Sequence, residues 1–299
     1  MIISRRSESL SAPDTEGPSV PPPGPPLPHV EGVEHRFASV NGVRLHYAAA
    51  GRGDLLVLLH GWPQHWWAWR EVIPALAQRY RVICPDIRGL GWSEAGGEPG
   101  LDGLVADLVG LLDELGVGRA RLAAHGLGAT IGYAACLRSP DRFSHFVPTG
   151  ALTPWAGGGS PLPHLRSWHA GALALLGPDA ATRLRLPELA LRAWRRQGRF
   201  TAEETSTHLD SLDRLASARA SRHYARAVTL PTLRSRDERR LEVPTLHLNG
   251  ELDPLTRGVA QSFQAHAPGM RSELVPGCGH FLAEEAPRPL LDRLEEFLA

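Results

Sequence analysis

The stretch "RLAAHGLGATIGYAA", residues 121–135, decides the fold of this chain. An apolar strand pattern leads into a tight glycine-containing turn, and a helix pattern rich in small residues follows. This order matches a nucleophile elbow, whose close backbone approach requires small residues two positions before and two after the nucleophile. Ala124 and Gly128 supply those small residues, so the nucleophile position falls on Gly126.

A frame shifted by one residue would make His125 the nucleophile. It would also place Leu127 at a position restricted to small residues, and we therefore reject it. His125 is expected beside the pocket, in a supporting role.

Strand and helix patterns alternate around the elbow. "HRFASVNGVRLHYAAAG" (35–51) predicts a hairpin turning at Asn41-Gly42. "DLLVLLHG" (54–61) and "RVICPD" (81–86) are continuous apolar runs, typical of strands buried on both faces of a parallel sheet. "LDGLVADLVGLLDELGV" (101–117) has the three- and four-residue spacing of an amphipathic helix. The alternation predicts an α/β fold with a mostly parallel, twisted sheet flanked by helices.

Four parts follow along the chain. Residues 1–32 are rich in proline and predict an extended or disordered arm. Residues 33–152 carry the first part of the α/β core, and residues 240–299 carry the second. Between them, residues 153–239 combine Gly- and Pro-rich loops with helical patterns, such as "LPELALRAWRRQ" (186–197), and no convincing strand. This part is expected to be an inserted helical layer.

Composition limits the partners. The chain has 299 residues with zero formal net charge, and all its basic residues are arginine. It therefore lacks the positive field that nucleic acid or an anionic membrane selects, and a small, weakly charged molecule fits better. Cys84, Cys136 and Cys278 are too few and too scattered for a disulfide framework or a metal site. With no membrane-spanning apolar run and no secretory signal pattern, a cytoplasmic protein is expected.

Two late motifs complete a catalytic pattern. "LNGELDP" (248–254) places Asp253 after a strand, and "PGCGHFLAEEAP" (276–287) places His280 in the loop after the next strand. The chain order is then nucleophile position, acid and histidine. Asp253 would hold the tautomer of His280, and His280 would act as general base. The backbone amides of Trp62 and Leu127 are candidate oxyanion donors.

This ensemble resembles the α/β-hydrolase superfamily, and within it the epoxide hydrolase and haloalkane dehalogenase branch, from about residue 33 to the end. The resemblance implies a core with a helical cap (153–239) and an active site between them, lined by apolar and aromatic side chains. Trp66 and Trp155 are candidates for that lining. No metal or organic cofactor is implied. The motifs that carry the resemblance are "HGWPQHWWAWR" (60–70), "PDIRGLGWSE" (85–94), "AHGLGAT" (124–130), "LNGELDP" (248–254) and "GCGHFLAEEAP" (277–287).

The chain departs from that branch in two places. The family's elbow aspartate, which attacks carbon, is replaced by Gly126, and a glycine offers no lone pair for a covalent intermediate. Epoxide hydrolases usually present two cap tyrosines, whereas Tyr224 is the one tyrosine between residues 153 and 239. Tyr224 is the candidate cap acid. The arginines of "LRAWRRQGR" (191–199) are interpreted as a solvated helix face.

These departures leave several hypotheses. The first is an active enzyme in which His280 and Asp253 work directly as general acid and base on a small apolar substrate, for which we expect a natural-product metabolite. The chemistry would be hydrolysis by activated water, or proton transfer giving cyclisation, isomerisation or elimination. The alternatives are an inactive homologue that acts as a binding protein, and an engineered Asp-to-Gly variant of an epoxide hydrolase. Oligomeric state is left open, with a homodimer among the options.

Overall fold

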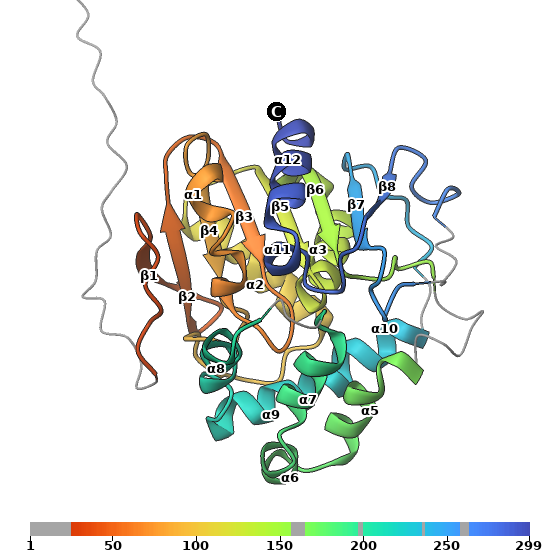
Figure 1. The fold of residues 1–299 in the computed structure, drawn as a ribbon. Coiled ribbons are helices and arrows are strands. Elements are labelled where there is room, and N and C mark those ends of the chain that lie inside the picture. The colour runs from red at the N-terminus through yellow and green to blue at the C-terminus, as the bar shows by residue number, and fades with distance from the viewer. Residues whose placement is uncertain (1–24, 157–164, 197–199, 235–236, 258–262) are drawn as a thin grey trace, which may run out of the picture.

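A computed structural model describes residues 25–156, 165–196, 200–234, 237–257 and 263–299 (Figure 1). Eight strands in this part of the chain form one sheet, in the order β1-β2-β4-β3-β5-β6-β7-β8. Their bounds are Glu34–Val40 (β1), Val43–Ala50 (β2), Leu55–Leu59 (β3), Arg81–Pro85 (β4), Ala120–His125 (β5), Phe143–Thr149 (β6), Leu246–Gly250 (β7) and Arg271–Val275 (β8).

The sheet is antiparallel only at its first edge. β1 pairs with β2, and β2 with β4, in antiparallel register, and all later pairs are parallel. Asn41 and Gly42 both have positive φ, of 48° and 77°, as a two-residue hairpin turn of this kind requires. The predicted opening hairpin and the mostly parallel α/β sheet are thus confirmed.

Helices cover both faces of the sheet. One face packs against α2 (Leu101–Glu114) and α3 (Leu127–Arg138). The other packs against a short 3-10 helix (Trp66–Trp69), α1 (Ile73–Leu76), α11 (Leu282–Glu285) and α12 (Pro287–Phe297). Because side chains alternate along a strand, β3 sends Val57 to the first face and Leu56 and Leu58 to the second. The continuous apolar runs in the sequence reflect this double burial.

A helical layer is inserted between β6 and β7, and we call it the cap. Figure 1 shows it below one end of the sheet. Glu204 and Thr201 form a capping box at the start of one cap helix, and Glu204 also contacts Arg70 of the core at 2.6 Å. The cap elements are α5 (Trp168–Leu175), α6 (Pro178–Arg183), α7 (Leu186–Trp194), α8 (Ala202–Asp210), α9 (Leu215–Tyr224), a π-helical stretch (Ala225–Thr229) and α10 (Leu230–Arg234).

Two stretches with helix-forming composition are each divided into shorter helices. Residues 66–80 form only the 3-10 helix and α1, because Pro74 occupies the first turn of α1 and interrupts the backbone hydrogen bonding. Residues 201–228 do not form a single helix: α8 ends at Asp210, and α9 begins after Arg214, which has an extended conformation.

Part of the arm is packed on the core. Residues 1–24 lie outside the described residues, whereas Leu27 and Val30 pack against the core face that carries α1 and α12. The indole of Trp92 donates to the carbonyl of Pro25 at 2.9 Å. Among the described helices, none combines the length and apolar character needed to cross a membrane.

Candidate active site

The site lies at the carboxyl ends of β3 and β5. These strands are neighbours in the sheet, although β4 separates them in the chain. Consecutive connections therefore leave in opposite directions at this point, which is where open α/β sheets bind their ligands. The turn after β3 carries Trp62, the turn after β5 carries Gly126, and both line a pocket beneath the cap.

Gly126 adopts a conformation that other residues rarely take. Its φ is 53° and its ψ is −115°, and its N–H donates to the carbonyl of Thr149 at 3.0 Å. A Cβ built on Gly126 would lie 3.7 Å from the Cα of Gly61 and 4.0 Å from Nε2 of His280. The position therefore has room for a side chain, and that side chain would face His280.

Gly128 is confined instead. A Cβ there would lie 2.7 Å from the carbonyl oxygen of Leu59, closer than real Cβ contacts allow. The requirement for a small residue two positions after Gly126 thus comes from the close approach of α3 to β3.

Asp253 and His280 are brought together from adjacent loops. His280 Nδ1 lies 3.2 Å from both carboxylate oxygens of Asp253, and both side chains are buried. Asp253 also accepts hydrogen bonds from the N–H of Leu255 at 2.8 Å and the hydroxyl of Thr256 at 3.1 Å. The carboxylate thus fixes the N–H of His280 on Nδ1, which leaves a lone pair on Nε2.

These contacts keep Asp253 ionised. Burial raises the pKa of its carboxyl, but the adjacent His280 ring and the hydrogen bonds from His280, Leu255 and Thr256 outweigh burial and lower the pKa below its usual value. The dyad therefore has a fixed negative charge behind a histidine whose Nε2 lies 4.0 Å from the position of a Cβ on Gly126.

Glu285 positions the loop that carries His280. Its carboxylate accepts from the N–H groups of Gly279 at 2.7 Å, Arg196 at 3.2 Å and Phe281 at 3.4 Å. Burial raises the pKa of Glu285, although these N–H donors oppose the shift. Sequence reasoning missed this residue, because glutamate side chains are mostly exposed in folded proteins.

The pocket between core and cap has a cavity volume of about 110 Å³. The core supplies Trp62, Leu127 and His280 to its lining. Leu127 is the first residue of α3, so its N–H has no partner within the helix. The cap wall contains Ser167, His169, Ala170, Leu173, Trp194, Ser221, Tyr224, Ala225, Thr229, Thr232 and Leu233.

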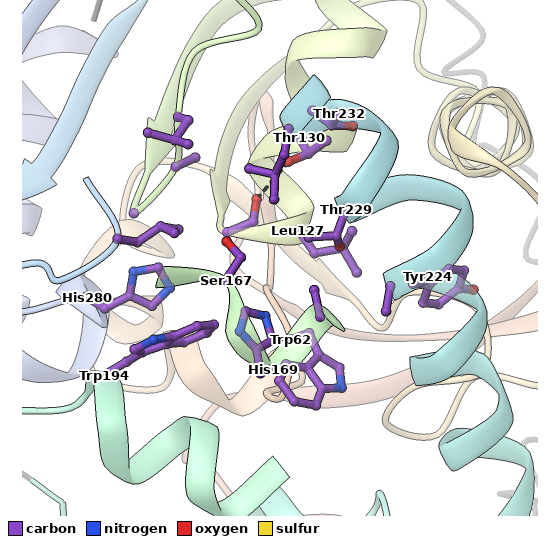
Figure 2. A pocket seen from close by; sticks show the side chains of 18 of the residues that line it. Trp62, Leu127, Thr130, Ser167, His169, Trp194, Tyr224, Thr229, Thr232 and His280 are labelled. Atoms are coloured by element: carbon purple, nitrogen blue, oxygen red, sulfur yellow. Dashed lines mark hydrogen bonds between the residues drawn. The ribbon is translucent and has the colours of Figure 1, made fainter. Parts of the chain in front are cut away.

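Two cap rings that the sequence did not single out line the same pocket as His280 (Figure 2). Trp194 is 6% exposed, and its ring lies 5.0 Å from that of His280. The solvated face that we expected for the arginines of residues 191–199 therefore does not include Trp194. His169 packs edge-on to Trp194 at 4.2 Å and stacks on Trp62 at 5.4 Å.

The family model for the alpha/beta hydrolase fold matches residues 54–287. The chain belongs to the α/β-hydrolase family. A soluble epoxide hydrolase from Corynebacterium sp. (strain C12) is 30% identical over 290 residues, which cover 89% of this chain and 98% of that one. The homologues of this chain thus include epoxide hydrolases.

Solved structures agree with this assignment. The epoxide hydrolase CorEH without ligand has a TM-score of 0.76 at 28% identity, covering 89% of this chain and 98% of that chain. Cfl2 from Burkholderia cenocepacia has a TM-score of 0.79 at 28% identity, covering 90% and 96%.

Tyr224 differs from what the family resemblance implied. Its ring lines the pocket, but its hydroxyl donates to the carbonyl of Arg88 at 2.6 Å. Figure 2 shows the hydroxyl turned away from His280. Burial raises the pKa of Tyr224 well above its usual value, so the phenol stays protonated. The structure thus assigns this hydroxyl to a contact between cap and core.

Two of the tryptophans expected in the pocket do not line it. Trp66 is fully buried on the other face of the sheet, where its ring lies 5.0 Å from that of His35. Trp155 stacks on His266 at 5.5 Å with an interplanar angle of 4°. Both were wrong as pocket candidates, because each large ring finds an aromatic partner within the core.

His125 lies behind the pocket and outside its lining. Its ring packs edge-on to that of His280 at 4.7 Å, and Nδ1 lies 3.2 Å from the hydroxyl of Thr149. Burial, with a smaller effect of His280, lowers the pKa of His125 well below its usual value. A neutral His125 thus supports His280 from the core side. Within the described residues, no group of three or more His, Cys, Asp or Glu side chains is arranged to hold a metal ion.

Proposed function

We propose that this α/β-hydrolase chain is an enzyme that uses His280 and Asp253 directly as general acid and base, without a covalent intermediate. One observation carries the proposal: Nε2 of His280 faces the open space at Gly126, 4.0 Å from the position of a Cβ. We infer that Gly126 stands at the nucleophile position of the family. A glycine there cannot attack, so the attacking or departing atom belongs to water or to the substrate.

The mechanism follows from the hydrogen bonds. Because Asp253 accepts the proton on Nδ1, Nε2 of His280 accepts a proton from an oxygen bound in the space beside Gly126. Asp253 stabilises the imidazolium that forms. The backbone N–H groups of Trp62 and Leu127 stabilise negative charge that develops on the substrate. General acid and base catalysis of this kind contributes roughly 10²- to 10⁴-fold.

Two reactions fit this arrangement. If the oxygen beside Gly126 is water, the reaction is direct hydrolysis. If it is a hydroxyl of the substrate, its deprotonation leads to cyclisation, isomerisation or elimination. The epoxide hydrolases among the relatives support a strained cyclic ether as the electrophile.

The lining supports an apolar, ring-bearing substrate. Trp62, His169 and Trp194 offer aromatic surfaces, and Leu127 and Leu173 add apolar area. Aromatic rings of this size bind flat apolar molecules well. We extend the proposal to metabolites of natural-product type on this ground.

The test is turnover of a panel of aromatic epoxides and activated esters by the protein, by His280→Ala and by Gly126→Asp. His266→Ala is the matched control, since His266 stacks on Trp155 outside the pocket. The proposal predicts turnover by the protein and the control, and its loss in His280→Ala. Turnover by Gly126→Asp alone would contradict noncovalent hydrolysis.

A second candidate is a binding protein that kept the pocket and lost catalysis. The same open space at Gly126 favours it, because the space can hold an oxygen of a bound ligand without any reaction. This candidate predicts that His280→Ala leaves biological activity unchanged, whereas the enzyme proposal predicts its loss. Sequencing the native gene decides whether Gly126 replaced an aspartate by engineering.

A further inference from the structure

The hydrogen-bonding groups on the cap side of the pocket are not all available to a ligand. Tyr224 donates its hydroxyl to the carbonyl of Arg88. Ser221 donates to the carbonyl of Ser217 at 2.8 Å and accepts from the indole N–H of Trp62 at 3.0 Å. These two polar side chains of α9 are therefore committed to the protein.

His169 is placed differently. It comes from the first turn of α5, is 7% exposed and lines the pocket. Its Nδ1 is buried without a hydrogen-bond partner among the described residues. Because this nitrogen belongs to a residue that lines the pocket, a bound ligand can supply the missing partner.

Aromatic contacts hold the His169 ring in one orientation. The ring stacks on Trp62 with an interplanar angle of 14° and meets Trp194 edge-on at 87°. Trp194 in turn packs against His280. His169 and His280 thus flank the pocket from the cap and from the core, and Figure 2 shows both rings at its wall.

The ring of His169 is neutral. Burial, with a smaller effect of His280, lowers its pKa from 6.5 to about 3. A neutral imidazole offers one N–H donor and holds its proton firmly. Such a ring suits hydrogen bonding to an oxygen that gains negative charge during a reaction.

We propose that His169 is a further catalytic residue, which donates a hydrogen bond from its neutral ring to the substrate oxygen that becomes negative. That oxygen belongs to an epoxide, a carbonyl or a similar neutral group. On the core side His280 takes a proton from the attacking oxygen, which bonds to the substrate carbon as that carbon's bond to the substrate oxygen (the π bond, in a carbonyl) breaks. His169 binds the oxyanion that results on the cap side, and the oxyanion then takes a proton from His280 or from water, which returns His280 to its neutral form. This inference rests on the function proposed above, and it gives His169 the part that a cap tyrosine plays elsewhere in the branch.

Two substitutions of His169 separate hydrogen bonding from packing. His169→Phe keeps a ring between Trp62 and Trp194 and removes both nitrogens. His169→Gln restores an N–H donor on a neutral side chain. His223→Phe is the matched control in the cap, because the His223 ring bonds the carbonyl of Pro99, away from the pocket.

The expected result with a substrate from the panel is a loss of about 10²- to 10³-fold in kcat for His169→Phe, the usual effect of removing one oxyanion donor. KM should change little, since the interaction strengthens only as charge develops. His169→Gln should regain part of the loss, and His223→Phe should match the unmodified protein. An unchanged kcat in His169→Phe, while His280→Ala is inactive, would overturn this inference and leave the proposed function standing.

A binding measurement tests the hydrogen-bonding role of His169 in the absence of turnover. Protein labelled with ¹⁵N-histidine is titrated with benzamide, a neutral ligand with a carbonyl oxygen, and the His169 signals are assigned by their absence in His169→Phe. The inference predicts that benzamide moves the His169 N–H signal downfield. If no substrate is turned over and this shift occurs, the proposed function fails while the hydrogen-bonding role of His169 holds. An unmoved signal with bound benzamide contradicts that role.

Discussion

Alanine substitution at Gly126 and at Gly128 compares a position that has room for a Cβ with one that is packed tightly against the backbone. At Gly126 the added Cβ meets nothing closer than 3.7 Å, so the cost is conformational. An L-residue at φ 53° and ψ −115°, a sparsely populated backbone region, loses about 1–3 kcal/mol. At Gly128 the Cβ would overlap the backbone carbonyls of Leu59 and His60. Because these belong to the central strand region and cannot move freely, we expect a loss of about 3 kcal/mol or more, at the upper end of overpacking.

Urea denaturation followed by circular dichroism measures both losses in free energy of unfolding. In thermal unfolding followed by the same circular dichroism signal, Gly126→Ala should also lower the melting temperature by several degrees, at about 2–4 °C per kcal/mol for a domain of this size. Gly171→Ala, in α5 with nothing within 4 Å of its Cβ, is the control and should be neutral or stabilising. A loss in Gly126→Ala as large as that in Gly128→Ala would refute the argument that the position beside His280 is open.

Three further predictions follow. First, burial lowers the pKa of three histidines from 6.5, to about 3 in His65 and His169 and to about 4 in His247. Each neutral histidine therefore contributes to the free energy of unfolding above pH 6.5, and this contribution is lost as pH falls toward the folded pKa of 3 or 4. At pH 5 each should cost about 2 kcal/mol, and equal urea midpoints at pH 7.5 and pH 5 would contradict this. Second, Tyr224→Phe removes the hydrogen bond to Arg88, so it should cost about 1 kcal/mol in unfolding free energy and leave kcat unchanged; a large fall in kcat in steady-state assays would return the phenol to the mechanism. Third, Glu285→Ala leaves the N–H groups of Gly279 and Phe281 without their acceptor. The free energy of unfolding should fall by about 1–3 kcal/mol, and turnover should fall as well. Full activity would show that the loop carrying His280 keeps its position without Glu285.

The sequence was sufficient wherever local pattern and sheet topology decide the structure. Asn41-Gly42 fixed the hairpin, and uninterrupted apolar runs marked the strands buried on both faces. Asp253 and His280 follow the neighbouring parallel strands β7 and β8, so their side chains meet at the same edge of the sheet. That pairing could be expected without coordinates.

The cap wall could not be predicted in the same way. His169 and Trp194 lie in short helices whose orientation depends on how the cap docks on the core. The arginines around Trp194 concealed its buried face, although α7 is strongly amphipathic. The role of Tyr224 depends on which carbonyl its hydroxyl reaches. The position of Trp66 depends on the short 3-10 helix that places its ring in the core. These are long-range contacts, and residue spacing does not encode them.

The most direct test of the central claim is the intact mass of the protein during turnover. The protein and Gly126→Asp are each mixed with an excess of an aromatic epoxide from the panel, quenched with acid within milliseconds and weighed by mass spectrometry. The account predicts that the protein forms product while its own mass stays unchanged, because the dyad acts without a covalent intermediate. Added mass equal to one substrate molecule on the protein itself, formed and lost at the rate of turnover, would contradict it.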